Sequence, residues 1–313
     1  MSERNLSLDF FKLIFSLMVV GIHVRIFEDV NITLNFFLVE GVFRIAVPFF
    51  IIVNGYYYHS LTRTQKLSWF RRVFGLYIFW SVLFSIYWFD LDKPLLTMFN
   101  VFFGYYHLWY VVSVFLCGVT FYLINVFKFN NASMFFLFLY AVGCTIQYYF
   151  SLYNTSFSLV VEGKDNTYWL YRNFVFFSLP FFYLGAFIKN YTVNVKVNLS
   201  FLSKFILISL GLFFLEVTVN YLNSASRGGD MYFSLIFVAP LLFLFSLNLR
   251  MISNFKFLGL LSSGIYFVHP FFIMTYRKVF DFDTSQLYFF SLLSSVVITL
   301  VLIEINKKLK FIL

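Results

Sequence analysis

The chain has 313 residues, of which 61% are hydrophobic, 25% aromatic and only 12% charged, with a formal net charge of +9. In soluble domains about a quarter of all residues are charged, so this composition excludes an ordinary soluble globular protein. Apolar stretches of about twenty residues recur along the whole chain and indicate a polytopic helical membrane protein.

We predict an all-α integral membrane protein, a bundle of about ten transmembrane helices that forms one polytopic domain over residues 1–313, without a soluble domain. The predicted spans cover about residues 7–27, 36–58, 69–89, 99–127, 132–152, 171–189, 201–222, 231–248, 257–276 and 286–305. The fourth span is long enough to break, and Gly104 is the candidate point at which it starts.

The charged residues between the spans predict the orientation. One set of segments is mostly basic and holds Arg4, Arg63, Lys66, Arg71, Arg72, Lys128, Lys189, Lys196, Lys204, Arg250, Lys256, Lys307, Lys308 and Lys310. The opposite set holds most of the acids, such as Glu28, Asp29, Asp90, Asp92, Glu162, Asp165, Asp230, Asp281 and Asp283, with the basic residues Arg25, Lys93, Lys164, Arg227, Arg277 and Lys278. Cytoplasmic loops carry an excess of Lys and Arg, so both termini are predicted to be cytoplasmic. The basic excess is then mostly topological, which disfavours a nucleic-acid partner.

The first span carries three ionisable residues, Asp9, Lys12 and His23. Ionisable groups at membrane depth are costly and indicate a functional site. Lys12 and His23 are eleven positions apart, which is almost three helical turns, so both side chains lie on one helix face about 16 Å apart. This stripe is the centre of the predicted site.

The other spans add a short set of polar residues: Glu40, Arg44, His107, Arg172, Glu216 and His269. Glu40 and Arg44 have the spacing of a helical ion pair, in which Glu40 neutralises Arg44. Six of these groups fall near the midplane or in the outer half and predict one polar cavity: His23, Arg44, His107, Arg172, Glu216 and His269. The alternatives are a hydrogen bond between helices for any histidine, and membership of the interfacial aromatic belt for His107.

Three further features have plain structural interpretations. His59, beside a run of tyrosines, and the pair Arg71-Arg72 are typical of interfacial anchors. Cys117 and Cys144 lie in apolar segments without metal-ligand spacing, so no metal site is predicted. Pro270 follows His269 and frees a backbone carbonyl, which often marks a bent helix or one that lines a cavity.

Several motifs together resemble the membrane acyltransferase-3 family. They are Asp9-Phe-Phe-Lys12 followed by His23, Arg44-Ile-Ala-Val-Pro48-Phe-Phe, Asn54-Gly55-Tyr56, Arg71-Arg72, His107-Leu-Trp109, Phe181-Phe-Tyr-Leu-Gly185 and Tyr266-Phe-Val-His269-Pro270. Their order and spacing cover nearly the whole chain. The chain departs from the family pattern at Lys12, where the family has arginine, and at Asn54, where it usually has serine.

This resemblance implies an O-acyltransferase of the cytoplasmic membrane. Such enzymes move an acyl group, usually acetyl, from cytoplasmic acyl-CoA to a hydroxyl of an envelope glycan or lipid-linked sugar, without a metal. The chain would then act within the membrane lipid alone or with an envelope-biosynthesis partner protein.

The residues fit that implication. Lys12, Arg71 and Arg72 lie at the predicted inner face, where the phosphates of acyl-CoA would bind. A pantetheine arm along the first span would bring the thioester near His23, which then acts as general base or acyl carrier. His269 is a second candidate base. Oxyanion stabilisation or acceptor binding is open to Arg44, His107 and Arg172. The site would be supported by Asp9, Glu40 and Glu216.

Two other classes of function compete with the enzyme. A small-solute or amino-acid transporter also needs buried charge near the midplane, although the sequence shows neither an obvious repeat nor paired broken helices. A non-enzymatic scaffold for envelope assembly is the third hypothesis. Acyl-CoA binding by the purified protein would favour the enzyme over both.

Overall fold

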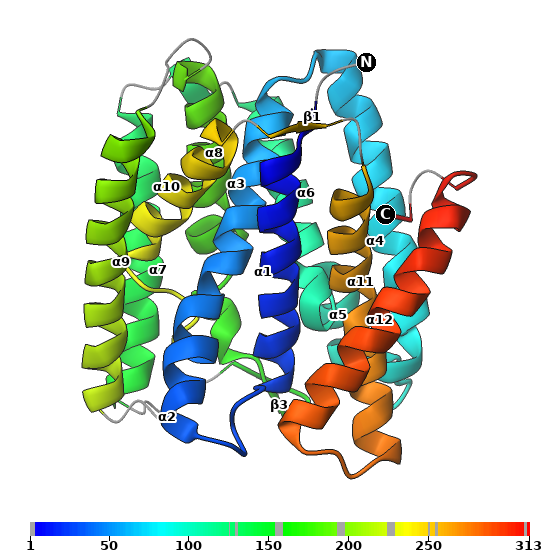
Figure 1. Cartoon of the computed structure of the whole chain (residues 1–313). Helices are drawn as coiled ribbons and strands as arrows, with labels where there is room; N and C mark the ends of the chain where they lie inside the picture. The colour runs from blue at the N-terminus through cyan, green and yellow to red at the C-terminus, as the bar shows by residue number, and fades with distance from the viewer. Residues whose placement is uncertain are drawn as a thin grey trace. The chain divides into compact units, whose positions relative to one another are not determined.

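The computed structural model describes residues 4–124, 126–128, 131–153, 159–192, 198–223, 229–249, 251–253, 256–309 and 312–313, and these are almost entirely helical (Figure 1). Four basic residues that entered the orientation argument lie outside the described residues: Lys196, Arg227, Arg250 and Lys310. The orientation of the termini therefore stays a prediction.

Nine helical segments of the described chain are long and apolar enough to cross a membrane: Leu6–Val24, Ile32–His59, Arg63–Trp88, Tyr106–Leu123, Ala132–Ser151, Phe174–Tyr191, Leu199–Leu222, Phe257–Val279 and Thr284–Asn306. This confirms the predicted all-α, multi-pass membrane bundle. The eighth predicted span forms α10 (Leu235–Asn248), whose 14 residues are shorter than the usual membrane-spanning length.

The described residues group into two compact units. Unit 1 comprises Met1–Phe50, Lys196–Gly228 and Phe237–Leu313, and unit 2 comprises Ile51–Val195 and Gly229–Ile236. The elements of unit 1 are β1 (Arg4–Asn5), α1 (Leu6–Val24), α2 (Ile32–Asn35), η1 (Phe36–Gly41), η2 (Val42–Ile45), α9 (Leu199–Leu222), β4 (Ile252–Ser253), α11 (Phe257–Val279) and α12 (Thr284–Asn306). Helices α3 (Ala46–His59) and α10 pass from one unit into the other.

Unit 2 holds the remaining elements: α4 (Arg63–Trp88), α5 (Pro94–Phe103), η3 (Tyr106–Leu108), α6 (Trp109–Leu123), η4 (Val126–Lys128), α7 (Ala132–Tyr153), β2 (Val160–Val161), β3 (Lys164–Asp165), η5 (Thr167–Leu170), η6 (Phe174–Ser178) and α8 (Leu179–Thr192). The strands β2 and β3 form a two-residue antiparallel ladder. Gly104, with φ of 85°, separates α5 from η3 and α6, as predicted from the fourth span. A side chain there would overlap the backbone of Leu108 and Trp109.

In unit 1, α11 packs against both α1 and α12. Strand β1 pairs antiparallel with β4 just before α11 begins, which ties the start of α1 to the same helix. Gly264 of α11 permits a close approach of α12, because a Cβ there would overlap Thr299. Small residues at such crossings let the backbones of membrane helices approach closely. Helix α11 is thereby fixed between its two neighbours.

Two of the nine spans contain a π-helical stretch. The second runs from α2 through the π-helix η1 and the 3-10 turn η2 into α3, and the sixth begins with the π-helix η6. Irregular backbone at membrane depth is tolerated where protein buries it, and π-helical turns often occur at functional sites. The second span predicted at about residues 36–58 is present as Ile32–His59, and its first half is π-helical and 3-10-helical rather than α-helical.

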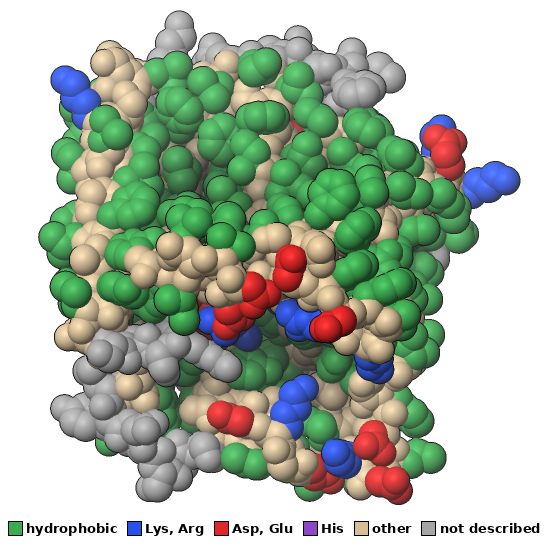
Figure 2. Space-filling model, turned by 60° about the horizontal axis from the view of Figure 1, so that its bottom comes forward, with side chains coloured by type: hydrophobic (Ala, Val, Ile, Leu, Met, Phe, Trp, Pro, Cys, Tyr) green, Lys and Arg blue, Asp and Glu red, His purple; other side chains and the backbone are tan. Residues whose placement is uncertain are grey.

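The surface matches a membrane protein. On the face shown in Figure 2, hydrophobic side chains cover most of the surface, and many of the acidic and basic side chains lie in the lower half of the view. Helices α4, α9 and α12 expose large apolar residues, among them Phe74, Leu207 and Val297. Such exposure is expected where lipid is the solvent.

Candidate functional site

The first turn of α1 contains a buried ion pair. Asn5 caps the helix by accepting a hydrogen bond from the Leu8 amide, which leaves Asp9 in the first turn, where a carboxylate interacts favourably with the helix dipole. The Asp9 carboxylate, only 2% exposed, lies 3.3 Å from the Lys12 ammonium, which is 20% exposed. Ser262 of α11 donates a hydrogen bond to the Lys12 carbonyl oxygen at 2.8 Å. Lys12 is therefore charge-paired and held against α11.

The two histidines predicted as candidate bases lie side by side. His23, in the last turn of α1, and His269, in the middle of α11, have ring centroids 5.3 Å apart with an interplanar angle of 31°. His269 is fully buried and His23 half-buried. The packing of α1 on α11 thus brings together two residues that are 246 positions apart in the sequence.

The His269 ring is oriented by its own helix. Its Nδ1 lies 2.9 Å from the carbonyl oxygen of Ile265, and the imidazole also hydrogen-bonds the backbone of Tyr266. Pro270 has no N–H to donate to the Tyr266 carbonyl, so the His-Pro sequence provides the acceptor that the histidine uses. We assign the proton to Nδ1, which leaves the Nε2 lone pair as the basic atom of the neutral ring.

A charged network surrounds the end of α1. Arg25 ends the helix in the left-handed conformation, with φ of 62°. Its guanidinium lies 2.8 Å from Glu28 and 3.7 Å from Glu40. Glu40 also pairs with Arg44, so the ion pair predicted from their spacing is present.

Arg277 of α11 extends this network to the first histidine. Its guanidinium donates a hydrogen bond to the His23 carbonyl oxygen at 3.1 Å. Helix ends leave carbonyl groups without helical partners, and Arg277 satisfies one of them. The helix that carries His269 thus also holds the turn that carries His23.

Glu216, the remaining candidate of unit 1, lies half-buried on α9. Its neighbour Val217 packs against Gly41, at the junction of η1 and η2. The structure thus places the helix that carries Glu216 beside the segment that carries Glu40. Its supporting role stays a prediction.

Unit 2 contains a second charged site at Arg172. Its guanidinium lies 2.8 Å from the Asp230 carboxylate and is stacked on Tyr168 and Trp109, with ring centroids 4.6 and 5.1 Å away. Arginine is well suited to this combination because its planar cation stacks on rings while it pairs with a carboxylate.

The other candidates of unit 2 lie apart from that stack. His107 is buried in η3, where it packs edge-on against Phe84 of α4 with ring centroids 5.2 Å apart. Arg71 and Arg72 are both exposed on α4, and Arg71 is one turn from the exposed Leu67 and Phe74. Their donor-binding role stays a prediction, and so does the single cavity that was expected to join candidates of both units.

Sequence reasoning missed three contributors to these contacts: Arg25, Asp230 and Arg277. All three were counted as loop charges because they flank spans. Their positions could have identified them, because each lies within a few residues of a predicted helix end on the side that was assigned as outer. No group of three or more His, Cys, Asp or Glu able to hold a metal occurs among the described residues.

Comparisons with known proteins agree with these motifs. A family model described as an acyltransferase domain matches residues 5–304. Two amino-acid racemases of Enterococcus faecalis are similar: one is 28% identical over 207 residues, 60% of this chain and 29% of the relative, and the other 26% identical over 308 residues, 89% and 42%. A serine/alanine racemase of Enterococcus gallinarum is 28% identical over 299 residues, 86% of this chain and 41% of the relative. The chain therefore spans less than half the length of these relatives, and no solved structure matches it significantly. Because the family match runs through nearly all of the helices described above, the chain belongs to the acyltransferase-3 family of membrane proteins.

Proposed function

We propose that this acyltransferase moves an acyl group, with acetyl as the leading case, from cytoplasmic acyl-CoA to a hydroxyl of an envelope glycan or lipid-linked sugar. The proposal includes a location in the cytoplasmic membrane with both termini inside. Family membership supports acyl transfer. The observation that carries the location of the chemistry is the pairing of His23 with His269, at 5.3 Å between ring centroids.

The histidine pair is suited to proton transfer. In the proposed reaction, the neutral His23 imidazole takes the proton from the acceptor hydroxyl as its oxygen attacks the thioester carbonyl carbon. The carbon–sulfur bond then breaks, and the CoA thiolate leaves and takes the proton from the imidazolium. His269, with Nδ1 bound to the Ile265 carbonyl, keeps its Nε2 lone pair as a second basic atom in the same place.

A two-step route uses the same residues. A ring nitrogen of His23 attacks the thioester carbon, the carbon–sulfur bond breaks, and CoA leaves as the thiol with the ring proton. The acceptor oxygen then attacks the acyl-imidazole, the nitrogen–acyl bond breaks, and the released imidazole takes the hydroxyl proton. The two routes differ in whether CoA is released before the acceptor binds. A burst of free thiol without acceptor supports the relay, and its absence supports direct transfer.

Variants of both histidines test the proposal. General-base assistance contributes about a hundred- to ten-thousand-fold in rate, so His23→Gln should reduce acyl transfer by at least about a hundredfold while acyl-CoA still binds. If the two histidines act as one unit, the double variant with His269→Gln should be no slower than the slower single variant. Near-normal transfer by His23→Gln would refute its chemical role and leave His269 as the candidate base.

A transporter is the second candidate function. Two relatives that match most of this chain are named for reactions of amino acids, serine and alanine among them, which are the solutes such a transporter would carry. The π-helical stretches η1 and η6 also favour it, because transporters bind their substrates at irregular parts of membrane helices. Uptake of serine and alanine into proteoliposomes, compared with thiol release from acyl-CoA by the same preparation, separates the two. Uptake without thiol release would overturn the acyltransferase proposal.

A further inference from the structure

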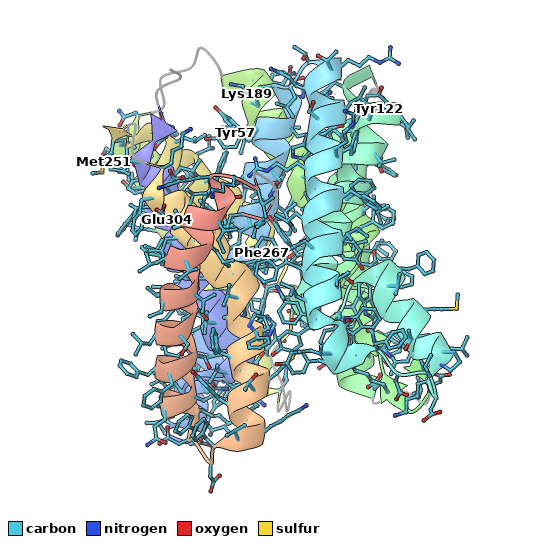
Figure 3. All side chains as sticks on the ribbon, turned by 90° about the vertical axis from the view of Figure 1, so that its right-hand side faces the viewer. Tyr57, Tyr122, Lys189, Met251, Phe267 and Glu304 are labelled. Carbon is cyan, nitrogen blue, oxygen red and sulfur yellow. The ribbon has the colours of Figure 1, made fainter. Side chains whose placement is uncertain are left out.

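One end of unit 2 gathers basic side chains from three helices. His59 ends α3, Lys66 lies in the first turns of α4, and Lys189 lies near the end of α8. Lys66 lies over the ring of Tyr58, the residue before His59, and Lys189 precedes Asn190, whose side chain hydrogen-bonds that of His59. Figure 3 shows Lys189 at this end of unit 2. We call His59, Lys66 and Lys189 the basic cluster.

Aromatic rings hold the two lysines in place. The Lys66 ammonium lies 4.9 Å from the centroid of the Tyr58 ring, and the Lys189 ammonium lies 5.0 Å from that of Tyr56. Both distances fall within the range of about 6 Å at which a cation is attracted to a ring face. Tyr58 is itself fixed, because its hydroxyl donates to the Gly118 carbonyl oxygen at 2.7 Å. The ammonium groups are thus partly ordered before any ligand binds.

A further cation flanks the basic cluster. Arg63, three residues before Lys66, donates from Nε to the Tyr122 hydroxyl at 3.1 Å and lies over the same ring. Figure 3 shows Tyr122 at the same end as Lys189. The basic surface at this end therefore extends beyond the three clustered residues.

Carboxylates do not balance this charge. The acidic residues of unit 2 are Asp90, Asp92, Glu162, Asp165 and Asp230, all in other connecting segments, and in the described chain the basic cluster forms no ion pair with any of them. An anion that binds within reach of both lysine ammonium groups is stabilised by each of them. Phosphate groups are the anions that lysine commonly binds in proteins.

The competing explanation is a set of ordinary interfacial anchors. Lys204 of α9 is an example of that kind, because it is exposed beside the exposed Phe201 and Phe205. Lys66 and Lys189 differ from it, since both are half-buried and stacked on rings. Both lysines also lie over tyrosines of one short segment of α3, Tyr56 and Tyr58, directly before His59.

We propose that the basic cluster is a binding site for phosphate groups. Two sources fit: the nucleotide phosphates of an acyl-CoA donor, and the phosphate of an anionic lipid headgroup. The first source rests on the proposed acyltransferase function and would place the donor's nucleotide end at Lys66 and Lys189 rather than at the exposed Arg71 and Arg72.

The test uses the purified full chain and a charge-neutral double variant, Lys66→Gln with Lys189→Gln. The expected result is that its dissociation constant for CoA rises at least about tenfold, equivalent to about 1.4 kcal/mol, while that for a pantetheine thioester without phosphates stays unchanged. Lys66→Arg with Lys189→Arg keeps the charges and should retain CoA binding. Lys204→Gln, the matched control, should bind like the wild type.

Thermal stability supplies a second measurement that does not depend on acyl transfer. The ligand-free double variant loses only two lysine–ring contacts, so its melting temperature should fall by a few degrees at most, which separates lost binding from misfolding. Pyrophosphate should raise the melting temperature of the wild type, because a ligand that binds only the folded state stabilises it, and should not raise that of the double variant.

The outcomes separate the two sources. If only CoA binding falls, the cluster binds the donor. If CoA binding is unchanged but stabilisation by nanodiscs of anionic phospholipid is lost, it binds a lipid headgroup. If the double variant responds to CoA, pyrophosphate and lipid like the wild type, the proposal is overturned, even if acyl transfer is active. A wild type that binds CoA through the cluster but transfers no acyl group would instead refute the proposed function alone.

Discussion

Replacing Lys12 with methionine separates its two possible roles, binding the donor and neutralising Asp9. The Asp9 carboxylate is 2% exposed and lies 3.3 Å from the Lys12 ammonium. Removing one partner of a buried ion pair costs about 3–5 kcal/mol, because the other charge stays buried without compensation. Lys12 keeps 20% exposure, so we expect the lower end, about 3 kcal/mol.

The control is a double variant, Asp9→Asn with Lys12→Met, in which neither charge remains. Its thermal stability in detergent should return close to that of the wild type, since replacing both members of a buried pair is often neutral. If Lys12 also binds the donor, this stable double variant still shows weakened acyl-CoA affinity. A Lys12→Met protein that is as stable as the wild type would refute the reasoning, because Asp9 would then not depend on Lys12.

Three further predictions concern other parts of the chain. Arg277→Gln removes the hydrogen bond to the His23 carbonyl and should lower kcat by about tenfold without raising the donor KM, since a charged hydrogen bond is worth about 1.5–3 kcal/mol; a change in KM alone would contradict a positioning role. Arg172→Lys keeps the charge beside Asp230 but loses the planar stacking, so the melting temperature should fall by several degrees, and an unchanged value would exclude a stabilising stack. A reporter fused at Leu313 should be active only in its cytoplasmic form, and a periplasmic signal would overturn the predicted topology.

Local patterns explain what could be predicted from the sequence. The apolar stretches fix the helical membrane character, because every backbone polar group in lipid must be satisfied within its own helix. The Glu40–Arg44 pair follows from a spacing of four residues, and the break at Gly104 follows from the one residue type that readily adopts its backbone conformation. The family was also recognisable, since its motifs occur in order along the chain.

The same local reasoning failed where backbone geometry depends on packing. The predicted second span is present, but nothing in the sequence indicated the π-helix η1 and the turn η2 within it, at whose junction Gly41 meets Val217 of α9. A hydrophobic pattern cannot reveal such a distortion, because the residues remain apolar whichever hydrogen bonds they form. Likewise, the pattern does not show that α10 stops after 14 residues.

The sequence by itself determined the membrane-embedded helices and the family to which the chain belongs. It also determined which ionisable residues lie inside those helices, where such residues usually mark a functional site. Only the tertiary structure decided which of those charges meet. His23 and His269 become neighbours because α1 packs on α11, and Arg172 meets Asp230 across 58 residues. It also showed that Lys66 and Lys189 lie over tyrosines of α3 while Arg71 is exposed. The physical reason is that hydrogen bonds within a helix act over four residues and can be read from spacing, whereas contacts between helices depend on the shapes of whole packed faces, which spacing does not encode.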